Sequence, residues 1–316
     1  MKVRFWGVRG SLPSPPTSDQ IRQKILRVLE KAACSDISSA IKREEFLSKF
    51  DNWEVGVIGG NTSCVEMSTN DTLLIFDMGS GMKKLGDYLI KKHSSEGNIL
   101  AHIFINHTHW DHMQGYPFFV PAYRPNTELH FYAVHENFLD RLNAQQDFRF
   151  FPVGLDIMAA QKHFHQIEVN SEQIINDLSI KNIELHHPGK SFAYKVTHNG
   201  RSAVYATDAE YNNLPKERMF EYINFYEGTD LLIFDAQYSF IEEIQKVDWG
   251  HSSALVGVDI AVKAHVKRLG LVHHAPENDD FEIHKLLNIA CEYRRNNYPD
   301  SQLEIFIGSE GLEIEI

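Results

Sequence analysis

One segment constrains this chain more than any other: it reads Asn-His-Thr-His-Trp-Asp-His and follows the apolar run Leu100–Ile105. His107 and His109, two apart in an extended turn, can reach one cation from the same side. Asp111 and His112 then turn toward a neighbouring position. Imidazole and carboxylate ligands of this kind suit Zn²⁺, and also Mn²⁺ or Fe. The alternative is a solvated polar loop, but three imidazoles and a carboxylate within six residues predict a metal site.

Short apolar runs recur along the chain and predict strands. They are Leu73–Phe76, Leu100–Ile105, Ile183–Leu185, Ala203–Ala206, Leu231–Phe234, Leu269–Val272 and Leu303–Ile307. The polar residues that follow the first six are Asp77, His107, His187, Asp208, Asp235 and His273. Loops at strand ends are where functional groups collect. We therefore expect further metal ligands there: His187, Asp208 (whose two oxygens could bridge two cations), and His273 or His274.

Helical patterns lie between these runs. Gln20–Lys49 is rich in helix, with a possible break near Ser35–Ser38. Two further helices are expected, one after His251 and one around Phe281–Arg295. Strands that alternate with helices favour a layered α/β fold. We predict one domain over residues 1–316, with a helical insertion at about residues 17–52.

Composition excludes several classes of protein. The formal net charge of −12 argues against broad attraction to a polyanion. No apolar run reaches the roughly 18 residues of a membrane span, and the N-terminus has no apolar signal-peptide region. Three scattered cysteines cannot form a disulfide framework. We expect a cytoplasmic protein with neither membrane nor nucleic acid as its partner.

The metal motif and several other segments resemble the metallo-β-lactamase superfamily of dinuclear metallohydrolases. These segments are FDMGSG, HTHWDH, SFAY, YATD, LIFDAQ, GHSS and LVHH. The resemblance covers nearly the whole chain apart from Gln20–Lys49, and is greatest to the tRNase Z-like phosphodiesterase branch. VRFWGVRGSLPSP, GGNTSC and WDHMQGYPFF further resemble bacterial and phage cyclic-nucleotide phosphodiesterases, including anti-Pycsar proteins. The resemblance to the superfamily implies a four-layer αββα sandwich.

The resemblance also assigns metal ligands by matching motifs. It gives the first metal to His107, His109 and His187, and the second to Asp111, His112 and His273, with Asp208 bridging. His273 is chosen over His274 because it directly follows a strand, as the family's C-terminal ligand does. Asp77 resembles the family's structural aspartate, which would hydrogen-bond the metal loop rather than touch metal.

Catalytic roles follow from the same resemblance. His251 matches a histidine near the leaving group and is our candidate general acid, with Asp235 orienting it and Asp111 acting as both ligand and catalytic residue. Asp235 stands where tRNase Z enzymes have the Glu of a His-Glu-Ala-Thr motif, but Phe234 and Gln237 replace its His and Thr. This departure weakens tRNA processing more than phosphodiester cleavage. The alternatives are a structural histidine at His251 and a turn residue at Asp235.

Substrate contacts are expected in two segments. Asn61 and Thr62 line the pocket on resemblance alone. Arg149 could meet phosphate or be a solvated charge. Phe151, with Phe148 and Phe150, could stack on a base or simply pack in a core or dimer contact.

The expected activity is hydrolysis of 3′,5′-cyclic nucleotides to nucleoside 5′-monophosphates. Two divalent ions, zinc first with manganese or iron as alternatives, would hold the attacking hydroxide between them. The resemblance further implies a homodimer. The alternative functions are an RNA 3′-end endonuclease, another ester hydrolase of the superfamily, and a cyclic-nucleotide-binding module without catalysis.

Overall fold

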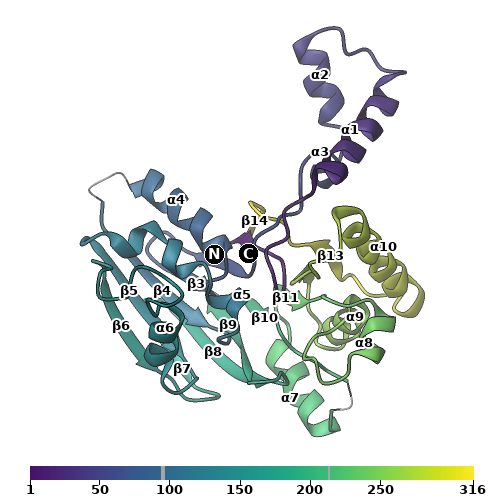
Figure 1. The fold of residues 1–316 in the computed structure, drawn as a ribbon. Coiled ribbons are helices and arrows are strands. Elements are labelled where there is room, and N and C mark those ends of the chain that lie inside the picture. Colours follow the sequence, from purple (N-terminus) through teal and green to yellow (C-terminus); the bar gives the residue numbers. More distant parts are fainter. Residues whose placement is uncertain (94–96, 213) are drawn as a thin grey trace.

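Two β-sheets packed face to face form the centre of the molecule (Figure 1). A computed structural model describes residues 1–93, 97–212 and 214–316, and in these ranges each sheet has seven strands. The first sheet runs β14 (Glu313–Glu315), β1 (Lys2–Gly7), β2 (Cys64–Ser68), β3 (Leu73–Phe76), β4 (Ile99–Ile105), β5 (Thr127–Ala133) and β6 (Gln161–Gln166). The second runs β13 (Glu304–Ile307), β12 (Arg268–Val272), β11 (Leu231–Asp235), β10 (Arg201–Ala206), β9 (Ser191–His198), β8 (Leu178–Leu185) and β7 (Glu172–Ile175).

Helices cover the outer faces of both sheets. On the first sheet lies α4 (Gly81–His93), and on the second lie α7 (Lys216–Tyr226), α9 (Ala254–Lys263) and α10 (Asp280–Asn297). Shorter helices connect strands: η1 (Tyr116–Phe118), η2 (Val120–Tyr123), α5 (Trp110–Met113), α6 (Phe138–Gln145) and α8 (Phe240–Gln245). The predicted four-layer αββα sandwich is therefore confirmed.

The central strands are apolar on both faces because both faces are covered. In β3, Leu74 and Phe76 face the other sheet, whereas Ile75 packs with α4 side chains such as Leu85. This double burial explains why the chain shows short continuous apolar runs rather than strict alternation.

Strand direction gathers the chemistry at one edge. Strands β3 to β6 are mutually parallel in the first sheet, and β10 to β13 are mutually parallel in the second. The carboxyl ends of parallel strands meet at one edge of a sheet, where ligands bind in open α/β sheets. The carboxyl ends of β4, β10, β11 and β12 and the loops that leave them carry most of the predicted metal ligands and Asp235, and His187 follows β8, which runs parallel to β10.

The apolar runs predicted as strands lie in strands of the structure, apart from Leu303, which directly precedes β13. The N-terminal segment MKVRFWGVRG, which also reads as a strand, contains β1, whereas the prediction did not include β2, β5, β6, β7, β9 or β14. Strand β6, for example, reads Gln-Lys-His-Phe-His-Gln and has little apolar signal because it is a partly exposed edge strand.

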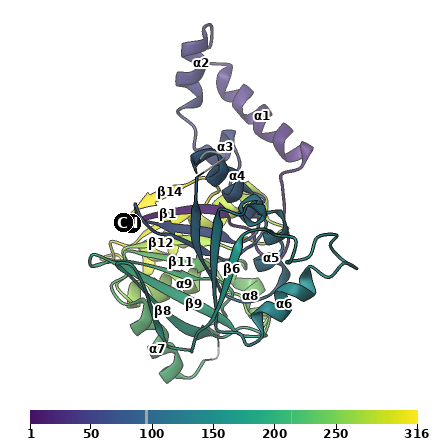
Figure 2. The same cartoon turned by 90° about the vertical axis from the view of Figure 1, so that its left-hand side faces the viewer.

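The predicted insertion forms a helical arm, residues 18–55, with α1 (Ser18–Ala32), α2 (Ala40–Leu47) and α3 (Asn52–Val55). The gap between α1 and α2 confirms the predicted break. In Figures 1 and 2, α1 and α2 project away from the sandwich. Ile25 and Leu29 are consequently 54% and 57% exposed, so their apolar face does not join the core.

The base of the arm is attached to the sandwich at α10. Lys24 is buried, and its Nζ donates hydrogen bonds to Oδ2 of Asp280 at 2.6 Å and to the carbonyl oxygen of Gly56 at 2.7 Å. Trp53 stacks on His284 with ring centres 4.3 Å apart.

Among the described residues, no helix combines the length and the apolarity needed to cross a bilayer. The single domain, the homodimer and the cytoplasmic location stay predictions.

Candidate metal centre

The first group of predicted ligands, His107, His109 and His187, meets at the edge where the parallel strands end. His107 follows β4, His109 precedes α5, and His187 follows β8. One ring nitrogen from each lies within 4.8 Å of the other two. Nε2 of His187 is 3.2 Å from Nδ1 of His109. A single cation can therefore contact all three imidazoles.

The second group consists of Asp111, His112, Asp208 and His273. One ligand atom from each of these residues lies within 4.8 Å of the other three. Nε2 of His273 is 3.3 Å from Nε2 of His112 and 3.2 Å from Oδ2 of Asp111. Asp208 lies between the groups: its Oδ2 is 3.1 Å from Nε2 of His112, and its Oδ1 is 3.8 Å from Nε2 of His107. This is the position that a bridging carboxylate requires.

The structure distinguishes the two histidines at the end of β12. Within the described ranges, His273 belongs to a potential ligand group and His274 does not. His274 is buried, and the nearby Arg9 contributes, after burial, to lowering its pKa to about 3. The geometry thus agrees with the choice of His273.

Three ligating histidines have their second ring nitrogen engaged by a neighbouring oxygen. The contacts are His107 Nδ1 to Asn106 Oδ1 at 2.7 Å, His112 Nδ1 to Asp77 Oδ2 at 2.7 Å, and His187 Nδ1 to the Gly250 carbonyl oxygen at 2.8 Å. Such bonds set the tautomer and the ring orientation, and leave each Nε2 as the ligand atom.

Asp77 makes the hydrogen bonds to the metal loop that the resemblance implied. Besides His112, it accepts from the backbone N–H of Asn106 at 2.8 Å and from the hydroxyl of Tyr205 at 2.7 Å. Its side chain is fully buried and lies outside the potential ligand groups of the described residues. Asp77 therefore holds the metal motif in place through hydrogen bonds and does not itself belong to a described ligand group.

The backbone is left-handed at three strand ends. Asp77, Asp208 and His273 have φ values of 63°, 59° and 61°. Residues other than glycine are uncommon in this region, although aspartate and histidine adopt it more often than most. Such conformations persist where the surroundings impose them, and they are concentrated at functional sites.

The charges of the second group stabilise one another. Burial acts to lower the pKa of His112, but Asp208 and Asp111 raise it well above its ordinary value. For His273, burial is likewise outweighed by Asp208 and Asp111, which raise its pKa to about 9. Burial alone would raise the pKa of Asp208, yet His112 and His273 hold it well below the usual range. A metal-free second site therefore holds protons that a cation must displace.

The first group has the opposite electrostatic character. Burial, followed by the nearby imidazole of His112, lowers the pKa of His107 well below its ordinary value. Burial likewise lowers the pKa of His187 to about 4. Neutral imidazoles are the form that binds a metal ion. The first group is thus already in its ligating state at neutral pH.

An unpartnered buried atom tests whether these residues fit metal ions. Nε2 of His107 is buried without a hydrogen-bond partner. Buried polar atoms normally have partners, so such atoms need an explanation. Nitrogen and carboxylate donors in two adjoining groups fit a dinuclear divalent metal site. The donor set does not distinguish zinc from manganese or iron.

His251 and Asp235 lie directly beside the second group. Nδ1 of His251 is 2.8 Å from Oδ2 of Asp235, and the two rings of His251 and His273 stack at 5.1 Å. Asp235 is fully buried and also accepts the backbone N–H of Asp208 at 3.0 Å. The aspartate therefore ties the candidate acid to the bridging residue.

The structure places Asn61 and Thr62 in a bonded turn. Nδ2 of Asn61 donates to Oε2 of Glu310 at 2.9 Å, and its Oδ1 accepts from Ser80 at 3.0 Å. Thr62 is fully buried, with its Oγ1 accepting from Gln114 at 2.9 Å. The contacts of both side chains join loops under the metal motif rather than lining an open pocket.

The predicted substrate contacts near residue 150 lie on the surface. Arg149 is paired with its neighbour Asp147 at 2.7 Å, and Phe151 packs edge-on against Phe118 with ring centres 5.5 Å apart. Neither belongs to the described ligand groups. Phe150, by contrast, lines a cavity of about 630 Å³.

That cavity adjoins the metal motif and was not predicted from the sequence. Thr108 and Trp110, which flank His109, form part of its wall together with Arg141, whose Nη1 donates to Oγ1 of Thr108 at 2.7 Å. A second missed contact is the backbone N–H of Ser11, which donates to Oδ2 of Asp111 at 2.8 Å. The exposed Trp inside the motif was the available signal for the cavity.

Comparisons with known proteins agree with this geometry. A family model described as a beta-lactamase superfamily domain matches residues 89–274. Ribonuclease Z of Prochlorococcus marinus is 25% identical over 264 residues, covering 65% of this chain and 78% of that protein. Human tRNase Z, short form, is 16% identical with a TM-score of 0.62, and yeast PDE1 is 12% identical with a TM-score of 0.61. Each of these two alignments covers 100% of this chain and 99% of the other, and shows a shared fold.

Proposed function

Because the chain belongs to the metallo-β-lactamase superfamily of hydrolases, on its tRNase Z-like branch, we propose that it is a metal-dependent cyclic-nucleotide phosphodiesterase. It would convert 3′,5′-cyclic nucleotides to nucleoside 5′-monophosphates. The observation that carries this proposal is the His251–Asp235 pair beside two adjoining metal-ligand groups.

The ligand groups, Asp208 and Asp77 would each have a separate role in phosphodiester cleavage. Two divalent ions held by the groups would supply electrostatic stabilisation of the phosphoryl oxygens and a nucleophile at neutral pH. Asp208 holds the two halves of the centre together through contacts to His107 and His112. Asp77 and its neighbours keep the ligand rings in place, so the site needs little reorganisation during the reaction.

His251 is the residue placed to protonate the leaving oxygen. Asp235 accepts the Nδ1–H of the ring, which leaves Nε2 to carry the proton that is donated. The side chain of His251 is 11% exposed, so a substrate can reach it while bulk water is largely excluded. Asp235 acts through His251 and is a positioning residue.

The cavity beside His109 supports a small nucleotide as the substrate. Its volume, about 630 Å³, lies in the range of small-molecule sites. Trp110 and Phe150 in its wall are 85% and 77% exposed, and aromatic rings of this kind can stack on a base. We infer that the base enters this cavity while the cyclic phosphate meets the metal centre.

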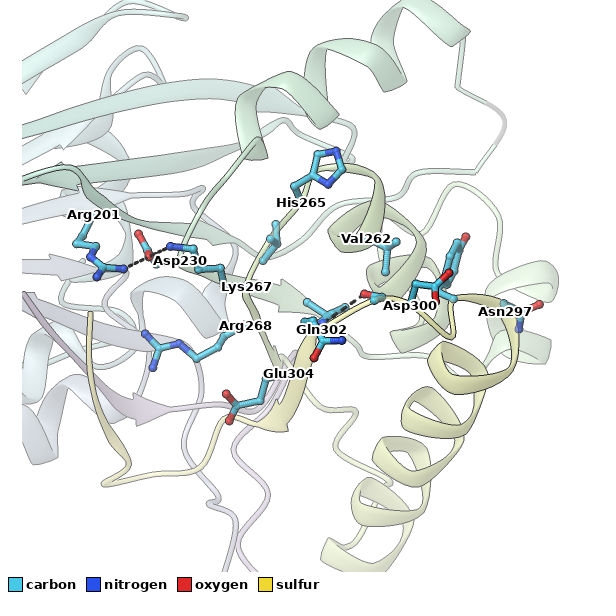
Figure 3. A pocket seen from close by; sticks show the side chains of 14 residues that line it. Arg201, Asp230, Val262, His265, Lys267, Arg268, Asn297, Asp300, Gln302 and Glu304 are labelled. Atoms are coloured by element: carbon cyan, nitrogen blue, oxygen red, sulfur yellow. Dashed lines mark hydrogen bonds and ion pairs between the residues drawn. The ribbon is translucent and has the colours of Figure 1, made fainter.

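An RNA 3′-end endonuclease is the second candidate, favoured by the ribonuclease Z relatives. RNA binding would draw on positive surface near the centre. The groove shown in Figure 3, at the amino ends of β10 to β13, is lined by three basic side chains and three acidic ones: Arg201, Lys267 and Arg268, and Asp230, Asp300 and Glu304. There Asp230 pairs with Arg201 at 2.8 Å and with Lys267 at 2.7 Å. This groove lies at the opposite end of the strands from the metal centre and its charges balance, so it does not supply such a surface.

A substrate panel tests the proposal. Metal-loaded protein is incubated with 3′,5′-cyclic nucleotides of each base and with a precursor tRNA, and the products are separated by chromatography. We expect chelator-sensitive formation of nucleoside 5′-monophosphates and no tRNA cleavage. Cleavage of the tRNA alone would replace the proposal with the second candidate. Tight nucleotide binding without any product would identify a binding module.

A further inference from the structure

A second row of histidines lies outside the metal centre, on the first sheet. His102 of β4 is in register with His130 of β5, and His130 is in register with His163 of β6. Side chains in register on neighbouring strands share a face of the sheet. Accordingly, the ring centres of His102 and His130 are 5.1 Å apart, and those of His130 and His163 are 4.5 Å apart.

A carboxylate completes this row. Glu128 precedes His130 by two residues on β5, so both side chains lie on the same face. Its Oε1 is 2.9 Å from Nε2 of His130 and 3.3 Å from Nε2 of His163. One donor atom from each of the three residues therefore converges on a common point, within 4.8 Å of the others.

Two features distinguish this cluster from a chance surface contact. Nδ1 of His130 is 3.0 Å from Nε2 of His165, and when Nδ1–H donates in this contact, Nε2 of His130 is left as a ligand atom. The side chains of Glu128 and His163 are each 44% exposed, so a cation and its water ligands can enter from solvent. Three protein ligands with an open position is the arrangement of a water-bearing zinc site.

We propose that Glu128, His130 and His163 form a further site for a zinc-type divalent cation, separate from the metal centre. On β4, the row lies five residues before His107, which corresponds to about 16 Å along the strand. Two imidazole nitrogens and one carboxylate oxygen suit Zn²⁺ and neighbouring transition-metal ions.

The cation would join β6 to β5. Strand β6 is the outer strand of the first sheet, at the left-hand rim of Figure 1. It contributes His163, whereas Glu128 and His130 belong to β5. A metal ion that binds only the folded pair of strands stabilises that pair by mass action.

Metal counting tests the proposal without any use of activity. The wild-type protein, His163→Ala and Glu128→Gln are loaded with zinc, freed of loose metal by gel filtration, and measured by plasma mass spectrometry. His198→Ala is the matched control, because His198 also contacts a carboxylate (Asp177, at 2.8 Å) but belongs to no potential ligand group of the described residues. Circular dichroism checks that each variant is folded.

We expect three zinc ions per chain in the wild type and in the control, and two in both test variants. Zinc added after the metal centre is filled should raise the unfolding temperature of the wild type and leave that of His163→Ala unchanged. Equal zinc content in the wild type and the test variants would overturn the proposal. So would the loss of more than one ion, since the residues would then act through the metal centre.

Discussion

The metal centre and the helical arm contrast in how the rest of the molecule covers them. In the centre, His112 and His273 are fully buried, and hydrogen-bonded neighbours hold the rings of the ligands. In the arm, Ile25 and Leu29 are more than half exposed, and Lys24 carries the buried contact with α10. The centre is therefore defined by tertiary contacts from many strands.

The helices of the arm depend more on local interactions. Helix α1 begins with a capping box in which Thr17 and Gln20 exchange hydrogen bonds. Substitutions in the centre should therefore act on chemistry and metal affinity. Substitutions on the exposed face of the arm should leave the sandwich intact.

The largest effect is expected at the bridging position. Asp208→Asn keeps the shape and tolerates the left-handed backbone, but removes the charge shared by both groups. We expect loss of bound metal and a fall in turnover of about 10³-fold, or about 4 kcal/mol. Metal analysis and hydrolysis of bis-p-nitrophenyl phosphate measure both. Full metal content with unchanged turnover would move the bridge to another residue.

The candidate general acid should give the next largest effect. His251→Ala is expected to lower turnover by about 10²-fold or more while both metal ions are retained, as the proposed role of His251 as the general acid requires. Asp235→Asn, which removes the orienting carboxylate, should shift the pH profile and lower turnover less. Loss of a metal ion from His251→Ala would instead identify His251 as a ligand.

The metal affinity of the second group should depend on pH. Asp208 and Asp111 outweigh burial and raise the pKa of His273 to about 9, so below that pH the cation must displace a proton. The same carboxylates also outweigh burial and raise the pKa of His112 well above its ordinary value, so a second proton is displaced. Affinity is then expected to increase by at least about tenfold per pH unit from pH 7. Zinc titration of metal-free protein against a competing chelator, at several pH values, measures this slope. A flat profile would contradict the raised pKa.

The smallest effect is expected on the arm. Leu29→Ser, at a site 57% exposed, should change the free energy of unfolding by less than about 0.5 kcal/mol. Leu85→Ala is the matched control, because Leu85 is fully buried between α4 and the first sheet, and should cost about 2 to 5 kcal/mol. Denaturant unfolding compares them. A large loss in Leu29→Ser would show that the apolar face of the arm is covered in solution.

The fold was largely predictable because apolar runs buried on both faces are conspicuous in the sequence. Each strand predicted from Leu73–Phe76 onward lies in a strand of the structure. Strands with exposed polar faces were missed, as β6 illustrates. The helical character of Gln20–Lys49 was also predicted correctly, but its outward direction was not, since amphipathic periodicity does not tell which surface will cover an apolar face.

The candidate site, like the fold, has features that could be predicted from the sequence and features that could not. The types of the candidate ligands could be read from the sequence, because the motif after β4 and the residues at later strand ends are local features. Only the tertiary structure decided which atoms meet: the position of Asp208 between His107 and His112, and the pairing of His251 with Asp235. It also decided that Trp110 lines a cavity together with Arg141 and Phe150. Strand order and sheet packing set distances between residues far apart in the chain, and no local pattern encodes them.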